Sequence, residues 1–292
     1  MMLSHNRYPY SAITERPDFS WPDGKRLAVY LGINLECFAF GEGLGAELAP
    51  GGPQPDVLNY AWRDYGNRVG AWRLLDLFDR LGLPTTALVN SSIYLEAPGL
   101  AEAFRARGDE IAGHGRTNAE RQGAMSEDDE RALIQEATHT LTQQEGSPPK
   151  GWLSPWISQS HLTPDLLQEA GYEYLLDWCH DDQPVWMATR GGKILSVPYP
   201  QELNDIPQIV GRKREGAEFC DMIIDAFDVM LEESARCPLV MGLALHGYIM
   251  GQPHRAKHLA RALRHMQSAG GGAVWWTTAG KINDHYRQLD LE

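Results

Sequence analysis

Residues 26–36 read RLAVYLGINLE, an apolar run that ends in two polar residues, Asn34 and Glu36. A short run of this aliphatic composition predicts a strand that is buried within a sheet. Because successive side chains of a strand point to opposite sides, Asn34 and Glu36 are expected to face the same way. The end of this first strand therefore presents an amide and a carboxylate together.

Seven further short apolar segments share the pattern of a polar residue placed at or soon after the segment's end. They are Thr85–Val89 before Asn90, Glu110–Ala112 before His114, Leu153 before Ser154 and Pro155, Tyr172–Leu176 before Asp177, Ile194–Tyr199 before Asn204 and Asp205, Leu239–Leu245 before His246, and Ala273–Trp276 before Thr277. Helical patterns such as Val69–Leu83 lie between most of them. This alternation predicts an α/β fold, a closed or nearly closed TIM-like barrel of parallel strands with helices outside. In such a barrel the carboxyl ends of the strands meet at the face that holds the active site.

The length of 292 residues fits one large α/β domain or two small ones, and the hydrophobic share of 43% is enough for a sizeable core. Because strands and helices alternate through the whole length, we expect a single domain that spans residues 1–292. Residues 1–22 carry prolines at positions 9, 17 and 22 and are predicted to form an irregular arm. The net charge of −13 argues against nucleic acid or an anionic membrane as a partner. It favours a small neutral substrate.

The chain shows no targeting segment. Met1–Ser20 lacks the basic and then apolar stretches of a secretion signal, and no apolar run is long enough to cross a membrane. The four cysteines are scattered without a CxxC pair, which is typical of reduced thiols rather than of disulfides or a zinc knuckle. We therefore expect a cytoplasmic protein.

Three residues that follow strands could carry chemistry. His114 and His246 can face each other across a barrel, and each can hold or move a proton near neutral pH. A single histidine is more often structural, but both of these follow apolar segments. Glu36 could be a general base, a metal ligand or a group that orients a donor. The loop that follows it, residues 41–55 (GEGLGAELAPGGPQP), is rich in Gly and Pro, so it is either a mobile surface loop or a substrate lid.

A zinc site is an alternative use of these residues, because zinc hydrolases bind their metal through three protein ligands and a water. The position four residues after His114 is Asn118, which is a poor ligand for a transition metal. This weakens the zinc hypothesis and leaves it open; if a metal is present, Glu36 and His114 are expected to hold it.

Ordered motifs along nearly the whole chain resemble the polysaccharide deacetylase superfamily. They are Trp21-Pro22, Asn34-x-Glu36, Tyr65-Gly66-Asn67-Arg68-x-Gly70-x-Trp72-Arg73, Gly108-x-Glu110-Ile111-Ala112-x-His114-Gly115, Pro198-Tyr199, Asn204-Asp205 and His246-x-x-x-x-Gly251-Gln252-Pro253-x-Arg255. The resemblance implies a distorted (β/α) barrel of seven to eight strands. It also implies an Asp-Asp pair and a His-xxx-His pair for metal, which Asn34-Leu35-Glu36 and Asn118 replace here. These departures argue against a metal-dependent sugar deacetylase.

The chain is more similar to the branch of that superfamily that hydrolyses ring amides, the cyclic imide hydrolases (imidases) and the metal-independent allantoinases. The stretch from Arg7-Tyr8-Pro9-Tyr10 through Pro17-Asp18-Phe19 favours the imidases. The resemblance implies a metal-independent hydrolase that opens succinimide-like or maleimide-like rings to half-amides. Related enzymes are homo-oligomers, often tetramers, so we expect a homo-oligomer here.

On this hypothesis Glu36 or His114 takes a proton from water, and His246 assists the leaving nitrogen. Contacts to the ring are expected from polar side chains and from aromatic side chains that could wall it. These residues are Asn34, Arg68, Asn90, Asn118, Trp156, Tyr199 and Asn204. For Arg68, a structural ion pair with Asp64 is an equal alternative. An allantoinase, a zinc-dependent deacetylase and a non-catalytic barrel are the competing hypotheses.

Overall fold

The computed structural model describes residues 4–289 and residue 291. Its centre is a nine-stranded sheet in the order β6-β7-β5-β4-β3-β2-β1-β8, in which β9 also pairs with β1. The strands are β1 (Leu27–Leu35), β2 (Thr85–Val89), β3 (Glu110–Gly113), β4 (Gly151–Trp152), β5 (Tyr174–Leu175), β6 (Val185–Thr189), β7 (Gly192–Ser196), β8 (Leu239–His246) and β9 (Val274–Thr277). β6 and β7 form an antiparallel pair, and the other paired strands run parallel.

β1 lies at the centre of this sheet. It pairs with β8 on one side, and on the other side with β9 along Leu27–Tyr30 and with β2 along Leu31–Leu35. All nine of its residues are buried. Because both its edges and both its faces are covered, no position of β1 meets solvent, which explains its continuous apolar sequence. The register places Asn34 opposite His246, so the ends of β1 and β8 lie together.

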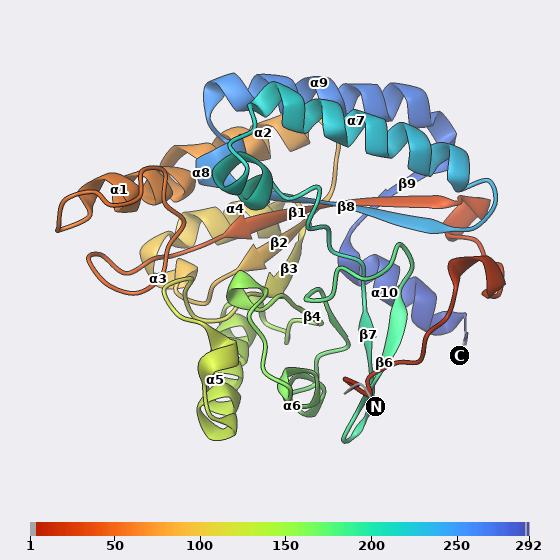
Figure 1. Ribbon diagram of the computed structural model, residues 1–292, viewed down its shortest axis with the longest axis horizontal. Coiled ribbons are helices and arrows are strands. Elements are labelled where there is room, and N and C mark those ends of the chain that lie inside the picture. Colours follow the sequence, from red (N-terminus) through yellow and green to blue (C-terminus); the bar gives the residue numbers. More distant parts are fainter. Residues whose placement is uncertain (1–3, 290, 292) are drawn as a thin grey trace.

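Helices surround the sheet (Figure 1), with α2, α7 and α9 over one side and α5 and α6 on the other. Their bounds are α1 (Val57–Tyr65), α2 (Ala71–Leu81), α3 (Ile93–Glu96), α4 (Pro98–Ala106), α5 (Glu127–Glu145), α6 (Thr163–Glu169), α7 (Gly216–Glu233), α8 (Gly247–Met250), α9 (Pro253–Gly270) and α10 (Ala279–Gln288). Local signals set several ends. Gly82 ends α2 in the left-handed conformation, and the Ser126 side chain caps α5 by accepting from the Asp129 amide. None of the helices in the described ranges is long and apolar enough to span a bilayer.

The barrel is almost closed. After β7 the chain touches β8 through one isolated parallel bridge, between Asn204 and Ala244. The predicted α/β fold of mostly parallel strands with outer helices is thereby confirmed. β6 was not predicted, because it pairs antiparallel with β7 through a tight turn at residues 190–191 and no helix separates the two strands.

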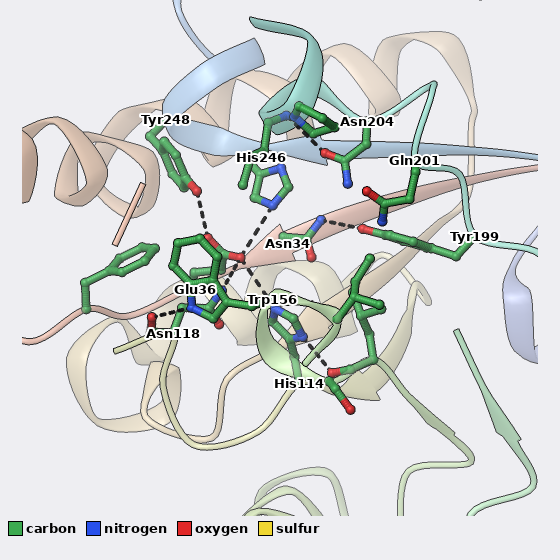
Figure 2. Close-up of a pocket in the computed structure, with 16 residues that line it drawn as sticks. Asn34, Glu36, His114, Asn118, Trp156, Tyr199, Gln201, Asn204, His246 and Tyr248 are labelled. Carbon is green, nitrogen blue, oxygen red and sulfur yellow. Dashed lines mark hydrogen bonds and ion pairs between the residues drawn. The ribbon is translucent and has the colours of Figure 1, made fainter. Parts of the chain in front are cut away.

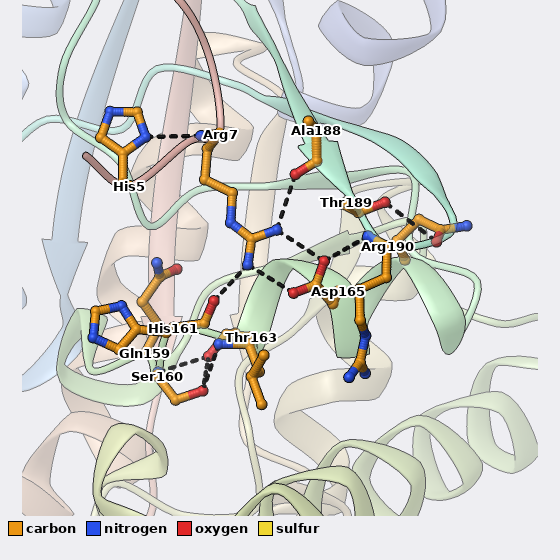
Figure 3. A network of polar contacts seen from close by, with 12 residues as sticks. His5, Arg7, Gln159, Ser160, His161, Thr163, Asp165, Ala188, Thr189 and Arg190 are labelled. Atoms are coloured by element: carbon orange, nitrogen blue, oxygen red, sulfur yellow. Dashed lines mark hydrogen bonds and ion pairs between the residues drawn. The ribbon is translucent and has the colours of Figure 1, made fainter. Parts of the chain in front are cut away.

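The N-terminal segment, residues 4–22, crosses the outside of the barrel without forming a strand. Its Arg7 guanidinium donates to both oxygens of Asp165, at 2.8 and 2.7 Å, and to the carbonyl oxygens of His161 and Ala188 (Figure 3). The Asp165 side chain is 3% exposed. Since this bidentate pair is charge-assisted and largely buried, it fixes the segment to α6 and β6.

Candidate active site

A small pocket opens where the carboxyl ends of β1, β3 and β8 meet, and it encloses about 100 Å³ (Figure 2). The sheet brings Asn34 and Glu36 there from the end of β1, His114 from the end of β3 and His246 from the end of β8. The full lining is Asn34, Glu36, Phe38, His114, Asn118, Leu153, Ser154, Trp156, Ile157, Tyr199, Gln201, Asn204, Ile206, Pro207, His246 and Tyr248. Residues far apart in the sequence therefore converge on one cavity.

The Glu36 carboxylate is the centre of the pocket. Its Oε1 accepts a hydrogen bond from Asn118 Nδ2 at 2.6 Å and lies 3.4 Å from Nε2 of both His114 and His246. Its Oε2 accepts from the Tyr248 hydroxyl at 2.9 Å. Glu36 is only 4% exposed, and the structure brings together the three residues expected to be catalytic.

The charges of this centre are set by burial and by neighbouring groups. Burial alone would raise the pKa of Glu36, but attraction to His246 and hydrogen bonds from both imidazoles outweigh it and lower that pKa well below its usual range. Burial alone would lower the pKa of His246, but the carboxylates of Asp205 and Glu36 raise it to about 10. At neutral pH Glu36 is therefore ionised and His246 is protonated.

Asp205 orients His246 from behind. Its Oδ1 lies 2.6 Å from His246 Nδ1, and its Oδ2 accepts from the His246 backbone amide at 2.8 Å. Asp205 is fully buried, and burial raises its pKa, which the neighbouring imidazolium partly offsets. The Nε2–H of His246 is thus held toward the pocket.

His114 is oriented differently, by a peptide group instead of a carboxylate. Its Nδ1 lies 2.7 Å from the carbonyl oxygen of Leu153. A carbonyl oxygen can only accept, so Nδ1 carries a hydrogen, and Nε2 is the ring nitrogen that faces Glu36 and the pocket. The same peptide donates its Ser154 N–H to Asp177 at 2.7 Å, and the Ser154 hydroxyl donates to that carboxylate at 2.7 Å.

Several of the expected binding residues line the pocket. Asn34 donates from Nδ2 to the Tyr199 hydroxyl at 3.1 Å and to the Leu245 carbonyl oxygen at 3.2 Å. Trp156 donates from its indole N–H to the Asn118 carbonyl oxygen at 2.9 Å, and Trp156 has a left-handed backbone, with φ of 63°. Asn204 also lines the cavity, beside the bridge that closes the barrel.

The structure corrects the expected role of Asn90, which does not line the pocket. Its side chain is fully buried behind the pocket wall. There it accepts from the Cys37 amide at 2.9 Å and donates to the His114 carbonyl oxygen and to Asn118 Oδ1. Asn90 therefore holds the loops that carry Glu36, His114 and Asn118 in place and has no access to a ligand.

The expected contact of Arg68 with the ring is also wrong, because the Arg68 side chain is 75% exposed and lies outside this pocket. It forms an ion pair with Asp64 at 2.5 Å, one turn earlier on the same helical segment. This is the structural alternative that the sequence left open.

Sequence reasoning missed Tyr248 and Gln201, and it noted Asp205 after an apolar segment without giving it a role. Tyr248 lies in α8 and Gln201 in the loop after β7, and neither directly follows a strand. Of the three, only Asp205 carried a signal, in the Asn204-Asp205 motif.

The donor set does not fit a zinc site. Among the described residues, no group of three or more His, Cys, Asp or Glu side chains is arranged to hold a metal ion. The amide of Asn118 turns its N–H group toward Glu36, so it offers a hydrogen where a second histidine would offer a lone pair. We therefore derive no step through a metal.

Comparisons with known proteins agree with this architecture. A family model described as polysaccharide deacetylase matches residues 58–175. A Schizosaccharomyces pombe protein that carries a polysaccharide deacetylase name is 27% identical over 90% of each chain. The crystal structure of a probable polysaccharide deacetylase from Pseudomonas aeruginosa PAO1 superposes with a TM-score of 0.86 at 29% identity, over 97% of this chain and 99% of that one.

These matches place the chain in the polysaccharide deacetylase superfamily. A second crystal structure, of PuuE allantoinase, superposes on this superfamily member with a TM-score of 0.85 at 27% identity, over 97% of this chain and 98% of that one. These two crystal structures carry different activity names, although their TM-scores and sequence identities to this chain are almost equal. The fold and a hydrolase family follow from these matches, and the site residues must decide between activities.

Proposed function

We propose that the protein is a hydrolase that opens the C–N bond of small cyclic imides, such as succinimide and maleimide, to half-amides. The observation that supports this best is the arrangement of two imidazoles around Glu36, each oriented by a different kind of partner. Two carboxylates hold His246 protonated, whereas the Leu153 carbonyl oxygen orients His114 so that its Nε2 faces the cavity, and we assign that nitrogen as the base. A base and an acid that face one small cavity are what ring opening by water requires.

The proposed reaction begins with a water molecule that attacks one ring carbonyl carbon while Nε2 of His114 takes its proton. The tetrahedral intermediate then collapses, the ring C–N bond breaks, and Nε2–H of His246 gives its proton to the departing nitrogen. A proton then passes from His114 to His246, which restores the site. Glu36 lies between them, since its Oε1 is 3.4 Å from Nε2 of each histidine. The low pKa of Glu36 makes it a weak base, so we assign it to holding and relaying charge.

The size and chemistry of the pocket support an imide over a sugar polymer. A cavity of about 100 Å³ is far below the roughly 300–1,000 Å³ of sites for drug-sized ligands. An imide carbonyl is more electrophilic than that of a simple amide, because the nitrogen lone pair is shared between two carbonyls. The leaving nitrogen is also less basic, so the barrier that the site must lower is smaller.

Two alternatives rest on specific observations. The similarity to PuuE allantoinase favours a ureide ring such as allantoin, which the same acid and base could open. The polysaccharide deacetylase family match favours a zinc-dependent sugar deacetylase, for which the pocket lacks the donor set.

One set of assays separates these functions. Hydrolysis of succinimide, allantoin and a chito-oligosaccharide is measured before and after stringent chelation. We expect succinimide turnover that persists without metal. Chelator-sensitive release of acetate from the oligosaccharide would replace our proposal by the deacetylase, and preferred turnover of allantoin would replace it by the ureide hydrolase.

A further inference from the structure

Gln201 carries a polar group in the pocket that no other residue satisfies. Its Nε2 is buried and has no hydrogen-bond partner among the described residues. Gln201 lines the same cavity as His246 and Asn204, and the close-up draws its amide on the side of the pocket away from Tyr248 (Figure 2). A buried donor without a partner is costly, because it has lost its water without replacement. Its place in the cavity suggests that a ligand supplies the partner.

We propose that the carboxamide of Gln201 pairs with the N–H and C=O edge of the ring, and thereby selects cyclic amides whose nitrogen carries a hydrogen. This inference rests on the proposed function and names the substrate class more closely. The Nε2–H donates to a ring carbonyl oxygen, and Oε1 accepts the hydrogen on the ring nitrogen.

The geometry of amides explains why such a pairing discriminates. In a five- or six-membered imide the N–H and each C=O lie on the same edge, because the ring forces the cis arrangement. A primary carboxamide has the same donor and acceptor spacing on its own edge, so the two groups can form a pair of parallel hydrogen bonds. The secondary amide of an N-acetyl sugar is trans, with its N–H and C=O on opposite sides, and can form only one of the two.

The pairing is also compatible with the proton transfer proposed above. The ring N–H lies in the plane of the ring, where Gln201 would accept it. The lone pair that forms on nitrogen in the tetrahedral intermediate projects out of that plane. Nε2 of His246 can therefore protonate the nitrogen from a direction that the Gln201 contact leaves free.

The first test needs no variant. The kcat/KM of the wild-type protein is compared for succinimide and N-methylsuccinimide, which differ only at the ring nitrogen. We expect succinimide to be favoured by at least about tenfold, because the methyl group removes one hydrogen bond and leaves the Gln201 oxygen facing carbon. Equal kcat/KM values would overturn the inference.

The second test assigns the preference to Gln201. In Gln201→Leu the kcat/KM for succinimide should fall by about tenfold or more, while that for N-methylsuccinimide should change little. The ratio of the two kcat/KM values should therefore approach one. Gln159→Leu is the matched control, since Gln159 lies outside the pocket and its side-chain oxygen accepts from the Trp178 indole N–H at 3.1 Å. A Gln201→Leu protein that keeps the wild-type ratio would refute the role of Gln201.

Failure of the Gln201 contact can be distinguished from failure of the proposed imide hydrolysis. If the wild type turns over neither imide, binding of succinimide and N-methylsuccinimide is measured by ligand-observed NMR with the wild type and with Gln201→Leu. A preference for the N–H imide that disappears in the variant would support the Gln201 contact while the proposed reaction fails. Binding without that preference, or no binding of either imide, would overturn the contact as well.

Discussion

At the scale of single residues the site depends on Glu36, because two imidazoles, an amide and a hydroxyl converge on its two oxygens. Its negative charge is one of the two that hold His246 protonated. The buried site would otherwise favour a neutral imidazole. One carboxylate therefore sets the protonation of the proposed acid.

Replacing Glu36 by Gln tests this role. The Glu36→Gln variant keeps the shape of the side chain but removes the charge, so the pKa of His246 falls and imide turnover should drop by about 10²-fold or more. The measurement is kcat/KM for succinimide, with thermal unfolding to show that the fold persists. Glu110→Gln is the control, because the Glu110 carboxylate accepts from Thr86 and Tyr174 at the opposite end of β3 and should be dispensable for turnover. Substantial activity in Glu36→Gln would remove Glu36 from the mechanism.

The raised pKa of His246 also predicts how stability depends on pH. A histidine whose pKa is about 10 in the folded state and about 6.5 in the unfolded state binds more protons when folded. Its contribution is therefore fully present below about pH 6.5 and is lost as the pH rises through about 10. Urea unfolding of the wild type and of His246→Gln should show a free-energy difference that shrinks across this range. A constant difference would mean that His246 is not protonated in the folded protein.

The sequence predicted the central residues of the site and missed those that complete it. Glu36, His114 and His246 were predictable because each lies at or directly after the end of a strand, and parallel strands end at one face. Tyr248 and Gln201 reach the same cavity from a short helix and from a loop, whose paths depend on tertiary packing. Trp156 was expected at the pocket, but its positive φ could not be predicted from the sequence.

At the scale of elements, the ends of β4 and β5 cooperate through a single peptide group. The Leu153 carbonyl accepts from His114, and the N–H of the same peptide donates to Asp177, which follows β5. A carboxylate on the N–H side polarises the peptide and makes its carbonyl a stronger acceptor. Asp177 is therefore predicted to position His114 without touching the substrate.

Asp177→Asn should lower kcat for succinimide several-fold and leave KM nearly unchanged. Burial raises the pKa of Asp177 to about 6, so the wild type should lose this support as the pH falls through that value. The variant should lack that part of the pH profile. Ser154→Ala, which loses the hydroxyl contact but keeps the backbone one, should retain it. An unchanged profile in Asp177→Asn would show that the carboxylate is only structural.

The loop of residues 41–55 is tied down beside the pocket. Its Leu44 amide donates to the Ala119 carbonyl oxygen at 3.0 Å, next to Asn118, and its Ala46 carbonyl oxygen accepts from Arg63 at 3.0 Å. Gly45 packs directly against the Arg63 guanidinium, which leaves no space for a Cβ atom.

Gly45→Ala should therefore push the Arg63 guanidinium aside and break its hydrogen bond to the Ala46 carbonyl oxygen, which should destabilise the protein by about 1 kcal/mol. Gly52→Ala, in the same loop, is the matched control and should be nearly neutral, because a Cβ at Gly52 would meet only the Ala49 carbonyl oxygen among the described residues, at an ordinary contact distance of 3.9 Å. Thermal unfolding and KM for succinimide measure the two effects. Equal behaviour of the two variants would show that the Arg63 contact does not hold the loop.

At the scale of the whole molecule, alternation of apolar segments and helical patterns was enough to predict the barrel. The alternation works because each parallel strand needs a crossover, and most of the crossovers here contain a helix, although the one between β5 and β7 does not. It failed only where β6 and β7 form a hairpin. The numbers of residues in β4 and β5 were also not predictable, since only two residues of each pair with their neighbours.

Metal removal is the test that addresses the molecule as a whole. Because the pocket lacks a zinc-type donor set, we expect imide turnover to persist after dialysis against a strong chelator, with less than one equivalent of metal by elemental analysis. Turnover lost on chelation and restored by zinc would contradict the proposal. Light scattering of the same sample tests the expected homo-oligomer.

The segment that carries Asn204 is joined to β8 by a single bridge, between Asn204 and Ala244. The proposed acid and base belong to strand ends that are paired along several residues, whereas Gln201 and Asn204 belong to a connection that the sheet hardly constrains. Changes in that connection can alter which ring is accepted without shifting the groups that break the bond. We therefore expect substitutions in this connection to change the ring specificity of this protein more readily than its proposed bond-breaking groups.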